Sequence, residues 1–345
     1  MRMNRFYKYL LMAIVLLSAS CRKGLEEGDY ADVIIKVQTP ASVGTRAYGD
    51  GLSAKNLVFG VFDETGAELP DLRQGDWTRS QSELTFDSVN SDGQPYVNVT
   101  VRLVKGKSYT FVCWAQDKSV SCYDFSDLNS IKVDYTKDNV ANNESRDAFY
   151  GCISSGVITD GVSPEMELRR PLAQLNVGTD PEDLESARAA GLDVDDIYIE
   201  VSVSRAPSAL VSDHEDLNYN VSSDHVTAEF TAGLSPVSFE SVNSHRLKVR
   251  FEDAGGNFSE KEYEWLGMNY IFTGLEPDDN KDVTFTIYEG DPENEGAVKI
   301  ASYTQTNVNF RANYRTNMVG NLLTADGGVE VFVSPIFENI ENKPL

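Results

Sequence analysis

The stretch VNVTVRLV, Val97 to Val104, changes between apolar and polar side chains at almost every position. Successive side chains of a β-strand point to opposite faces, so Val97, Val99 and Val101 would share one face. The pattern predicts a strand with one buried and one solvated face. The same alternation recurs in IYIEVSVS, LKVRF, VTFTIY and VEVFVS, which begin at Ile197, Leu247, Val283 and Val329.

Three other runs are more continuously apolar: VIIKV from Val33, NLVFGVF from Asn56 and YTFVCWA from Tyr109. Such runs are typical of strands buried on both faces. Clusters of Gly, Asn, Asp and Pro separate the runs, as turns require. Only DPEDLESARAAG, from Asp180, has a helix cap, an early proline and a glycine stop. Many short strands with little helix predict an all-β fold of antiparallel β-sandwiches.

The chain has 345 residues, a length typical of two domains. A boundary is expected near ELRRPLAQLNVGTD, where one set of strands ends and a fresh strand begins. We expect a sandwich at residues 31–168 and a second at residues 169–345, each with its own core.

The N-terminus has the layout of a secretory signal peptide at residues 1–20. Basic residues at positions 2, 5 and 8 precede the apolar run Tyr9–Leu17, which is too short for a permanent membrane span. Small residues then lead to Cys21, which matches the bacterial lipoprotein signal, although Ser18 stands where leucine is preferred. We expect Cys21 to be acylated, with palmitate among its chains, and residues 21–30 to form a tether. The alternative is a plain signal peptide with an incidental cysteine.

The acidic residues Glu26, Glu27 and Asp29 follow Cys21. They resemble the short signals that send lipoproteins of Bacteroidetes to the cell surface. We therefore expect a lipid-anchored protein of the cell outer membrane that is exposed at the surface, with an anchor facing the periplasm as the alternative.

The net charge is −24, from 30 Lys+Arg against 54 Asp+Glu. Binding to phosphate backbones needs clustered cations, so nucleic acid is excluded as a partner. Hydrophobic residues make up 41% of the chain, enough for packed cores, which argues against global disorder.

Residues for catalysis or metal binding are few. His214, His225 and His245 are expected in solvated loops or at strand ends, and no nucleophile, phosphate-loop or zinc motif is present in the sequence. The loop DSVNSDG, from Asp87, resembles half of an EF-hand loop, but Val89, Asp92 and Asn98 stand where its second ligand, its glycine and its closing glutamate belong, so it is interpreted as a turn. We expect no enzyme, no metal and no cofactor. Cys113 is expected to be a buried apolar residue, and the pairing of Cys113, Cys122 and Cys152 is left open.

Four stretches together resemble the fimbrillin-type lipoproteins of Bacteroidales, which include subunits of type V pili and many relatives of unknown function. The stretches are FVCWAQ, RDAFYG, LRRPLAQLNVGT and NYRTNMVGNLLT, which begin at Phe111, Arg146, Leu168 and Asn313. The resemblance implies two tandem transthyretin-like sandwiches after a lipoprotein signal peptide. It also implies a structural or adhesive component of a pilus (fimbrium), a role in cell adhesion, and partners that are other subunits or copies of the chain.

In these pilins an arginine-specific protease cuts a linker and frees the first strand. The matching position is Arg46, in the linker ASVGTRAYGD. A strand from the next subunit then fills the groove by β-augmentation. The candidate donor is the C-terminal strand with Val329, Val331 and Val333. Cleavage would also remove Cys21, so a cleaved subunit belongs to the shaft or tip, and an uncleaved one is an anchor or a free lipoprotein.

The alternative function is a surface lipoprotein that does not polymerise and binds a glycan or another host ligand. Sugars stack on exposed aromatic rings, and Trp77 and Trp265, in polar surroundings, are the candidates.

Overall fold

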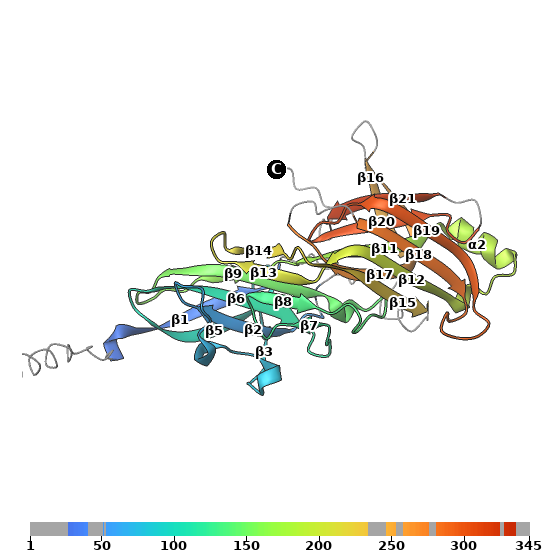
Figure 1. The fold of residues 1–345 in the computed structure, drawn as a ribbon. Coiled ribbons are helices and arrows are strands. Elements are labelled where there is room, and N and C mark those ends of the chain that lie inside the picture. The colour runs from blue at the N-terminus through green and yellow to red at the C-terminus, as the bar shows by residue number, and fades with distance from the viewer. Residues whose placement is uncertain are drawn as a thin grey trace, which may run out of the picture.

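The computed structural model describes residues 27–40, 51, 53–233, 246–252, 258–275, 281–324 and 328–335. They form an elongated all-β molecule with an N-terminal and a C-terminal lobe (Figure 1). The strands are β1 (Tyr30–Gln38), β2 (Asn56–Phe62), β3 (Leu84–Thr85), β4 (Ser88–Val89), β5 (Pro95–Val104), β6 (Ser108–Gln116), β7 (Tyr123–Asp124), β8 (Ser130–Val133), β9 (Ala148–Val157), β10 (Glu165–Glu167), β11 (Leu172–Thr179), β12 (Ile197–Pro207), β13 (Ala209–Asp213), β14 (Asn218–Val221), β15 (His225–Gly233), β16 (Arg246–Glu252), β17 (Phe258–Phe272), β18 (Lys281–Glu289), β19 (Val298–Val308), β20 (Tyr314–Gly320) and β21 (Val329–Pro335).

The N-terminal lobe has three layers of sheet. An outer sheet of order β10-β1-β5-β4 covers one face of a central sheet of order β3-β2-β6-β9. A flanking sheet of order β14-β13-β8-β7 covers the other face of the central sheet. Alternate residues of β2 therefore enter different cores: Phe59 packs toward the outer sheet, whereas Val58 and Phe62 belong to the cluster on the flanking side.

This layering tests the predicted burial of the three apolar runs. All seven residues of β2 are buried, and β6 is buried along most of its length, as predicted for strands covered on both faces. For β1 the prediction is wrong, because its burial alternates and Ile34 is 46% exposed. The outer sheet faces the central sheet on one side only, which accounts for the difference.

The C-terminal lobe is a two-layer sandwich. A five-stranded sheet of order β16-β17-β11-β20-β21 packs on a four-stranded sheet of order β15-β12-β18-β19. The predicted antiparallel pairing holds for most neighbours, but β1 pairs with β10, and β11 with β20, in parallel. The predicted helix is α2 (Pro181–Ala189); the Asp180 side chain caps it by accepting a hydrogen bond from the Glu182 N–H.

The two lobes share one hydrophobic cluster. Phe272 of β17 stacks on Tyr123 at 5.5 Å between ring centroids and meets Trp114 edge-on at 6.2 Å. The cluster between the outer and central sheets belongs to the N-terminal lobe alone, as expected, but the second expected core is not separate, because the shared cluster runs from the central sheet into the C-terminal sandwich. In addition, β13 pairs with β8 and β14 pairs with β13, so these two strands complete the flanking sheet of the N-terminal lobe. The boundary between residues 168 and 169 stays a prediction.

Candidate functional site

The first strand, β1, is held on one side along its whole length. Tyr30 to Gln38 pair with Val104 to Tyr96 of β5, whereas only Lys36 to Gln38 pair with β10 on the other side. The face of β1 toward the central sheet is wholly apolar. Its residues are Ala31, Val33, Ile35 and Val37, of which the last three have no exposed surface. The strand therefore lies in a groove, which we call the seat of β1. In this groove the backbone of β5 hydrogen-bonds β1, and apolar pockets of the central sheet receive its side chains.

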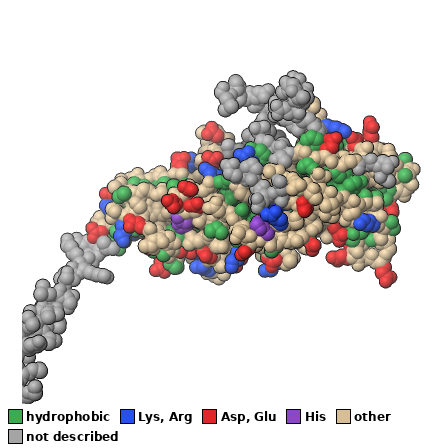
Figure 2. All heavy atoms as spheres, turned by 45° about the horizontal axis from the view of Figure 1, so that its top comes forward, with side chains coloured by type: hydrophobic (Ala, Val, Ile, Leu, Met, Phe, Trp, Pro, Cys, Tyr) green, Lys and Arg blue, Asp and Glu red, His purple; other side chains and the backbone are tan. Residues whose placement is uncertain are grey.

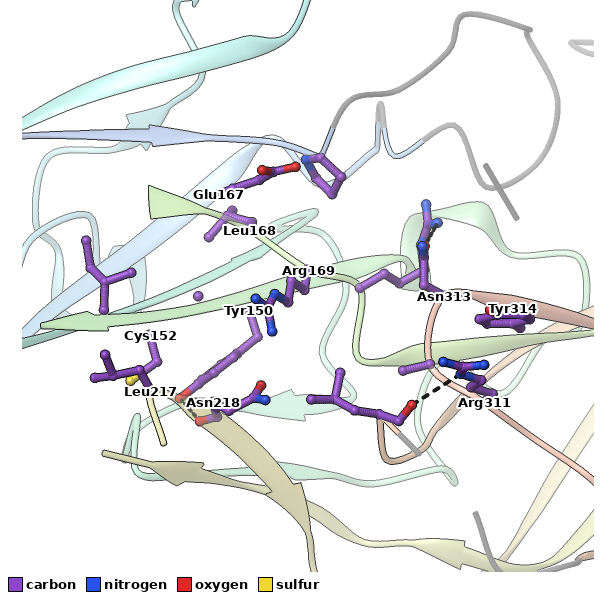
Figure 3. A pocket seen from close by; sticks show the side chains of 16 residues that line it. Tyr150, Cys152, Glu167, Leu168, Arg169, Leu217, Asn218, Arg311, Asn313 and Tyr314 are labelled. Carbon is purple, nitrogen blue, oxygen red and sulfur yellow. Dashed lines mark hydrogen bonds between the residues drawn. The ribbon is translucent and has the colours of Figure 1, made fainter. Parts of the chain in front are cut away.

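The chain leaves β1 at the rim of a cavity of about 630 Å³, which we call the junction cavity (Figure 3). Pro40 contributes to its wall, and the Leu168 N–H donates to the Gln38 carbonyl at 2.9 Å. The other walls come from β9, from the β10–β11 connection, from the turn before β14, from the segment that follows β17 and from the entry to β20. They include Tyr150, Cys152, Glu167, Arg169, Leu217, Asn218, Leu275, Arg311, Asn313 and Tyr314.

A buried ion pair lies beside this cavity. The Arg170 guanidinium donates from Nε and Nη2 to the two carboxylate oxygens of Asp147, both at 2.6 Å, and neither side chain has exposed surface. Arg170 also lies over the Phe149 ring at 5.0 Å and donates to the Asn313 Oδ1 at 3.2 Å. These residues belong to three of the four stretches that carried the family resemblance. Asp147 and Phe149 lie in RDAFYG, Arg170 lies in LRRPLAQLNVGT, and Asn313 lies in NYRTNMVGNLLT. Those stretches thus meet at the junction of the lobes.

Two other arginines of the cavity have no carboxylate partner among the described residues. Arg311 donates from Nε to the Leu275 carbonyl at 3.3 Å, and its guanidinium stacks over Tyr314 at 4.5 Å (Figure 3). Arg169 is exposed at the rim, where its backbone exchanges hydrogen bonds with Tyr150. The visible surface of both lobes, in contrast, carries scattered acidic side chains (Figure 2). The cavity is therefore a local cationic site on a strongly acidic chain.

His214 lies in a second, smaller pocket of about 340 Å³, between the turn that follows β2 and the β13–β14 turn. It was expected to be solvated, but it is half-buried, meets the Phe62 ring edge-on at 4.9 Å and hydrogen-bonds the Asn129 Oδ1 at 2.7 Å. Burial lowers the pKa of His214, and the adjacent Asp213 carboxylate opposes this in part. His225 is exposed as expected, and His245 lies outside the described residues.

The predicted site residues are not gathered in one place. Cys21 and Arg46 lie outside the described residues. Val329 and Val331 are half-buried on β21, the edge strand of the five-stranded sheet, and the backbone of Val333 pairs with Thr316 of β20. Among the described strands, β21 therefore has a neighbour on one side only.

The two candidate tryptophans also differ from expectation. Trp265 is 5% exposed, and its indole N–H donates to the Gly267 carbonyl at 3.2 Å, so its ring cannot stack on a sugar. Trp77 begins a short 3-10 helix, is half-buried and packs against Phe125 at 4.8 Å between ring centroids. Both rings were predicted to be exposed because their neighbours in sequence are polar. Their exposure depends instead on tertiary packing, which the sequence does not show.

In the part of the chain that the structure describes, no helix is long and apolar enough to cross a membrane. The same residues contain no group of three or more His, Cys, Asp and Glu side chains that could hold a metal ion. Cys113, Cys122 and Cys152 are buried and unpaired in the structure, which answers the open question of their pairing.

The fold and the junction cavity define an elongated, two-lobed all-β protein with a cationic cavity where the lobes meet. The model of a family of unknown function (DUF6562) matches residues 35–343, so the chain belongs to that family. No curated protein matches the chain.

Solved structures that are similar to the chain include the fimbrial anchor protein Mfa2 from Porphyromonas gingivalis. That match has 9% identity and a TM-score of 0.41, and covers 88% of this chain and 97% of that one. A fimbrial assembly protein from Parabacteroides distasonis matches with 12% identity and a TM-score of 0.44, covering 88% of this chain and 95% of that one.

Proposed function

We propose that this chain is a cell-surface lipoprotein of the fimbrillin type, a structural or adhesive pilus component that joins its neighbours by strand addition. The observation that carries the proposal is the seat of β1. Full burial of a Val or Ile side chain contributes about 1.5–3 kcal/mol, so a seat without its strand would be strongly unfavourable. The unpaired backbone of β5 and the row of apolar pockets would then accept another strand with the same alternation.

The donor in this proposal is β21. It has seven residues, lies at a sheet edge, and alternates Val329, Val331 and Val333 with other side chains. A seven-residue strand with this period can cover most of the nine-residue seat. The partner is therefore another pilus subunit or a second copy of this chain.

Cleavage after Arg46 would determine whether the protein is incorporated in a fimbrium or stays anchored to the outer membrane. Arg46 lies between β1, which ends at Gln38, and β2, which begins at Asn56, so a cut there would detach β1 together with Cys21 and any lipid on it. The cleaved subunit would enter a fimbrium. The uncleaved chain would stay on the outer membrane through its lipid, as an anchor or as a free lipoprotein.

The decisive experiment is mass spectrometry of the mature N-terminus on native cells. A chain that begins at Ala47 supports strand exchange, and a chain that begins only at acylated Cys21 contradicts it. In vitro, an arginine-specific protease should convert the purified chain to polymers visible by electron microscopy. The variant Arg46→Gln should stay monomeric, and Arg188→Gln, which alters an exposed arginine of α2, should polymerise like the parent.

The lipid anchor needs a separate test. Cells labelled with a clickable fatty acid should incorporate it into the parent chain but not into Cys21→Ala. Equal labelling of the variant would show that Cys21 is not the acylated residue.

A further inference from the structure

The junction cavity has features that strand addition does not use. Its volume of about 630 Å³ lies within the range of small-molecule sites in proteins. Its wall combines cations, amides and two tyrosine rings, contributed by six separate segments of the chain. None of these groups belongs to the face of β1 that packs on the central sheet.

The cations favour an anionic ligand. The chain has 54 acidic residues against 30 Lys+Arg, yet Arg169 and Arg311 have no carboxylate within ion-pair distance among the described residues. The Leu275 carbonyl and the Tyr314 ring hold Arg311 in place, and only its Nε is engaged. Within the described part of the chain its terminal nitrogens have no hydrogen-bond acceptor and remain as donors, in a geometry that suits a carboxylate. The one carboxylate of the wall, Glu167, is exposed at the rim.

The charge of the whole chain limits what kind of anion can bind. A net charge of −24 repels polyanions, whereas a single carboxylate feels mainly the nearby guanidinium groups. This favours a ligand with one negative charge over a nucleotide or a polyphosphate.

The amides of the cavity favour hydroxyl groups on the ligand. Asn313 accepts a hydrogen bond from Arg170 through Oδ1, so its amide N–H groups remain available to donate. The side-chain amide of Asn218 offers both a donor and an acceptor, while its backbone carbonyl accepts from the Tyr150 hydroxyl at 3.3 Å. Two such amides beside a cation suit a compact ligand with several hydroxyl groups.

We infer that the junction cavity binds an acidic sugar, a uronic or sialic acid residue, free or at the end of a glycan. In this assignment Arg311 binds the carboxylate, Arg169 assists from the rim, and Asn218 and Asn313 bind the hydroxyl groups. The site does not depend on cleavage at Arg46 and would operate in the lipid-anchored chain.

The test is calorimetric titration of the full mature chain carrying Cys21→Ala. The probes are N-acetylneuraminate and glucuronate, with N-acetylglucosamine and glucose as their neutral counterparts and acetate as a simple carboxylate. The acidic sugars should bind, and Arg311→Gln should weaken binding about tenfold or more, because it removes a charge that pairs with the ligand. Arg188→Gln, the same charge change on α2, should leave the affinity unchanged.

Equal binding of neutral and acidic sugars would overturn the role of the cations. Acetate that binds as tightly as the sugars would overturn the role of the hydroxyl groups, and no binding of any acidic sugar would overturn the site. Asn218→Ala provides a second variant if Arg311→Gln does not fold, as judged by circular dichroism. It should weaken the acidic sugars while leaving acetate unaffected.

Discussion

Arg170 and Asp147 form a two-pronged ion pair without exposed surface at the meeting point of the two lobes. We predict that Asp147→Asn destabilises the protein by about 3–5 kcal/mol, because it removes the carboxylate charge that faces a buried guanidinium at both of its hydrogen bonds. Urea unfolding followed by circular dichroism measures the change. Glu83→Gln is the matched control, since it removes a carboxylate from the exposed pair with Lys118 and should change stability by less than about 1 kcal/mol. Equal effects of the two variants would contradict the prediction.

The seat of β1 can be probed with two adjacent isoleucines. Ile35 has no exposed surface, whereas Ile34 is 46% exposed on the same strand. Ile35→Ala should destabilise the uncleaved chain by about 2–5 kcal/mol, and Ile34→Ala by much less, because only the first leaves a cavity. Thermal unfolding of both variants checks the difference. Similar losses would show that the strand does not insert one face into the core.

Gly320 sets the distance between β20 and β21. A Cβ at this position would lie 2.1 Å from the Gly328 carbonyl oxygen, so the two backbones meet closely. Gly320→Ala should detach β21 at this end and cost about 1–3 kcal/mol. Hydrogen exchange should show lost protection in residues 329–335. Gly328→Ala, whose Cβ would meet nothing within 4 Å, is the control and should leave the exchange unchanged.

The three described cysteines should not react in the native protein. Burial raises the pKa of the Cys122 and Cys152 thiols to about 11, and it also raises the pKa of the Cys113 thiol. Since the thiolate is the reactive form, a thiol reagent at pH 8 should label none of them quickly in a chain carrying Cys21→Ala. All three should react in guanidinium chloride. Fast labelling of one thiol before unfolding would show that the residue is accessible.

His214 should make the protein less stable in mild acid. Burial holds the pKa of His214 below the ordinary value of 6.5. The neutral side chain therefore makes its full contribution to the free energy of unfolding above pH 6.5. As the pH falls below 6.5 the unfolded chain takes up the proton more readily, and the contribution is lost. The stability loss between pH 7.5 and 5.5 should be smaller in His214→Gln than in the parent. The exposed His225 gives the control, and His225→Gln should keep the parental pH dependence.

Local pattern was sufficient for α2 and for the strands with clear alternation or a long apolar run, whereas β9, β15, β17 and β19 were not predicted. Alternation at Val97 to Leu103 predicts the buried face of β5, and the cap at Asp180 predicts where α2 begins. Local pattern cannot predict which strands pair across the chain. The pairing of β13 with β8 joins residues about 80 positions apart and depends on the apolar face that the central sheet leaves uncovered.

The cavity was missed for the same reason. Arg169 and Asn313 lie in the stretches that carried the resemblance, but nothing in the sequence shows that they face a cavity. Arg311, Asn218 and Leu275 have no motif of their own and meet only after folding. Arginines in such an acidic chain could have indicated an anion-binding site. The sequence alone, however, does not show which arginines have no carboxylate partner in the folded protein.

The pairing of β1 with β5 has a mechanical consequence. A lipid at Cys21 would pull on β1 from its Tyr30 end, which lies far from the C-terminal lobe (Figure 1). Antiparallel hydrogen bonds run perpendicular to the strands, so a load along β1 would shear the whole ladder at once instead of opening it bond by bond. A cell held through this protein against flowing liquid would therefore be secured by a joint that resists tension along its length. A protease that cuts after Arg46, beyond the other end of β1, would nevertheless remove the covalent link between this strand and the rest of the protein.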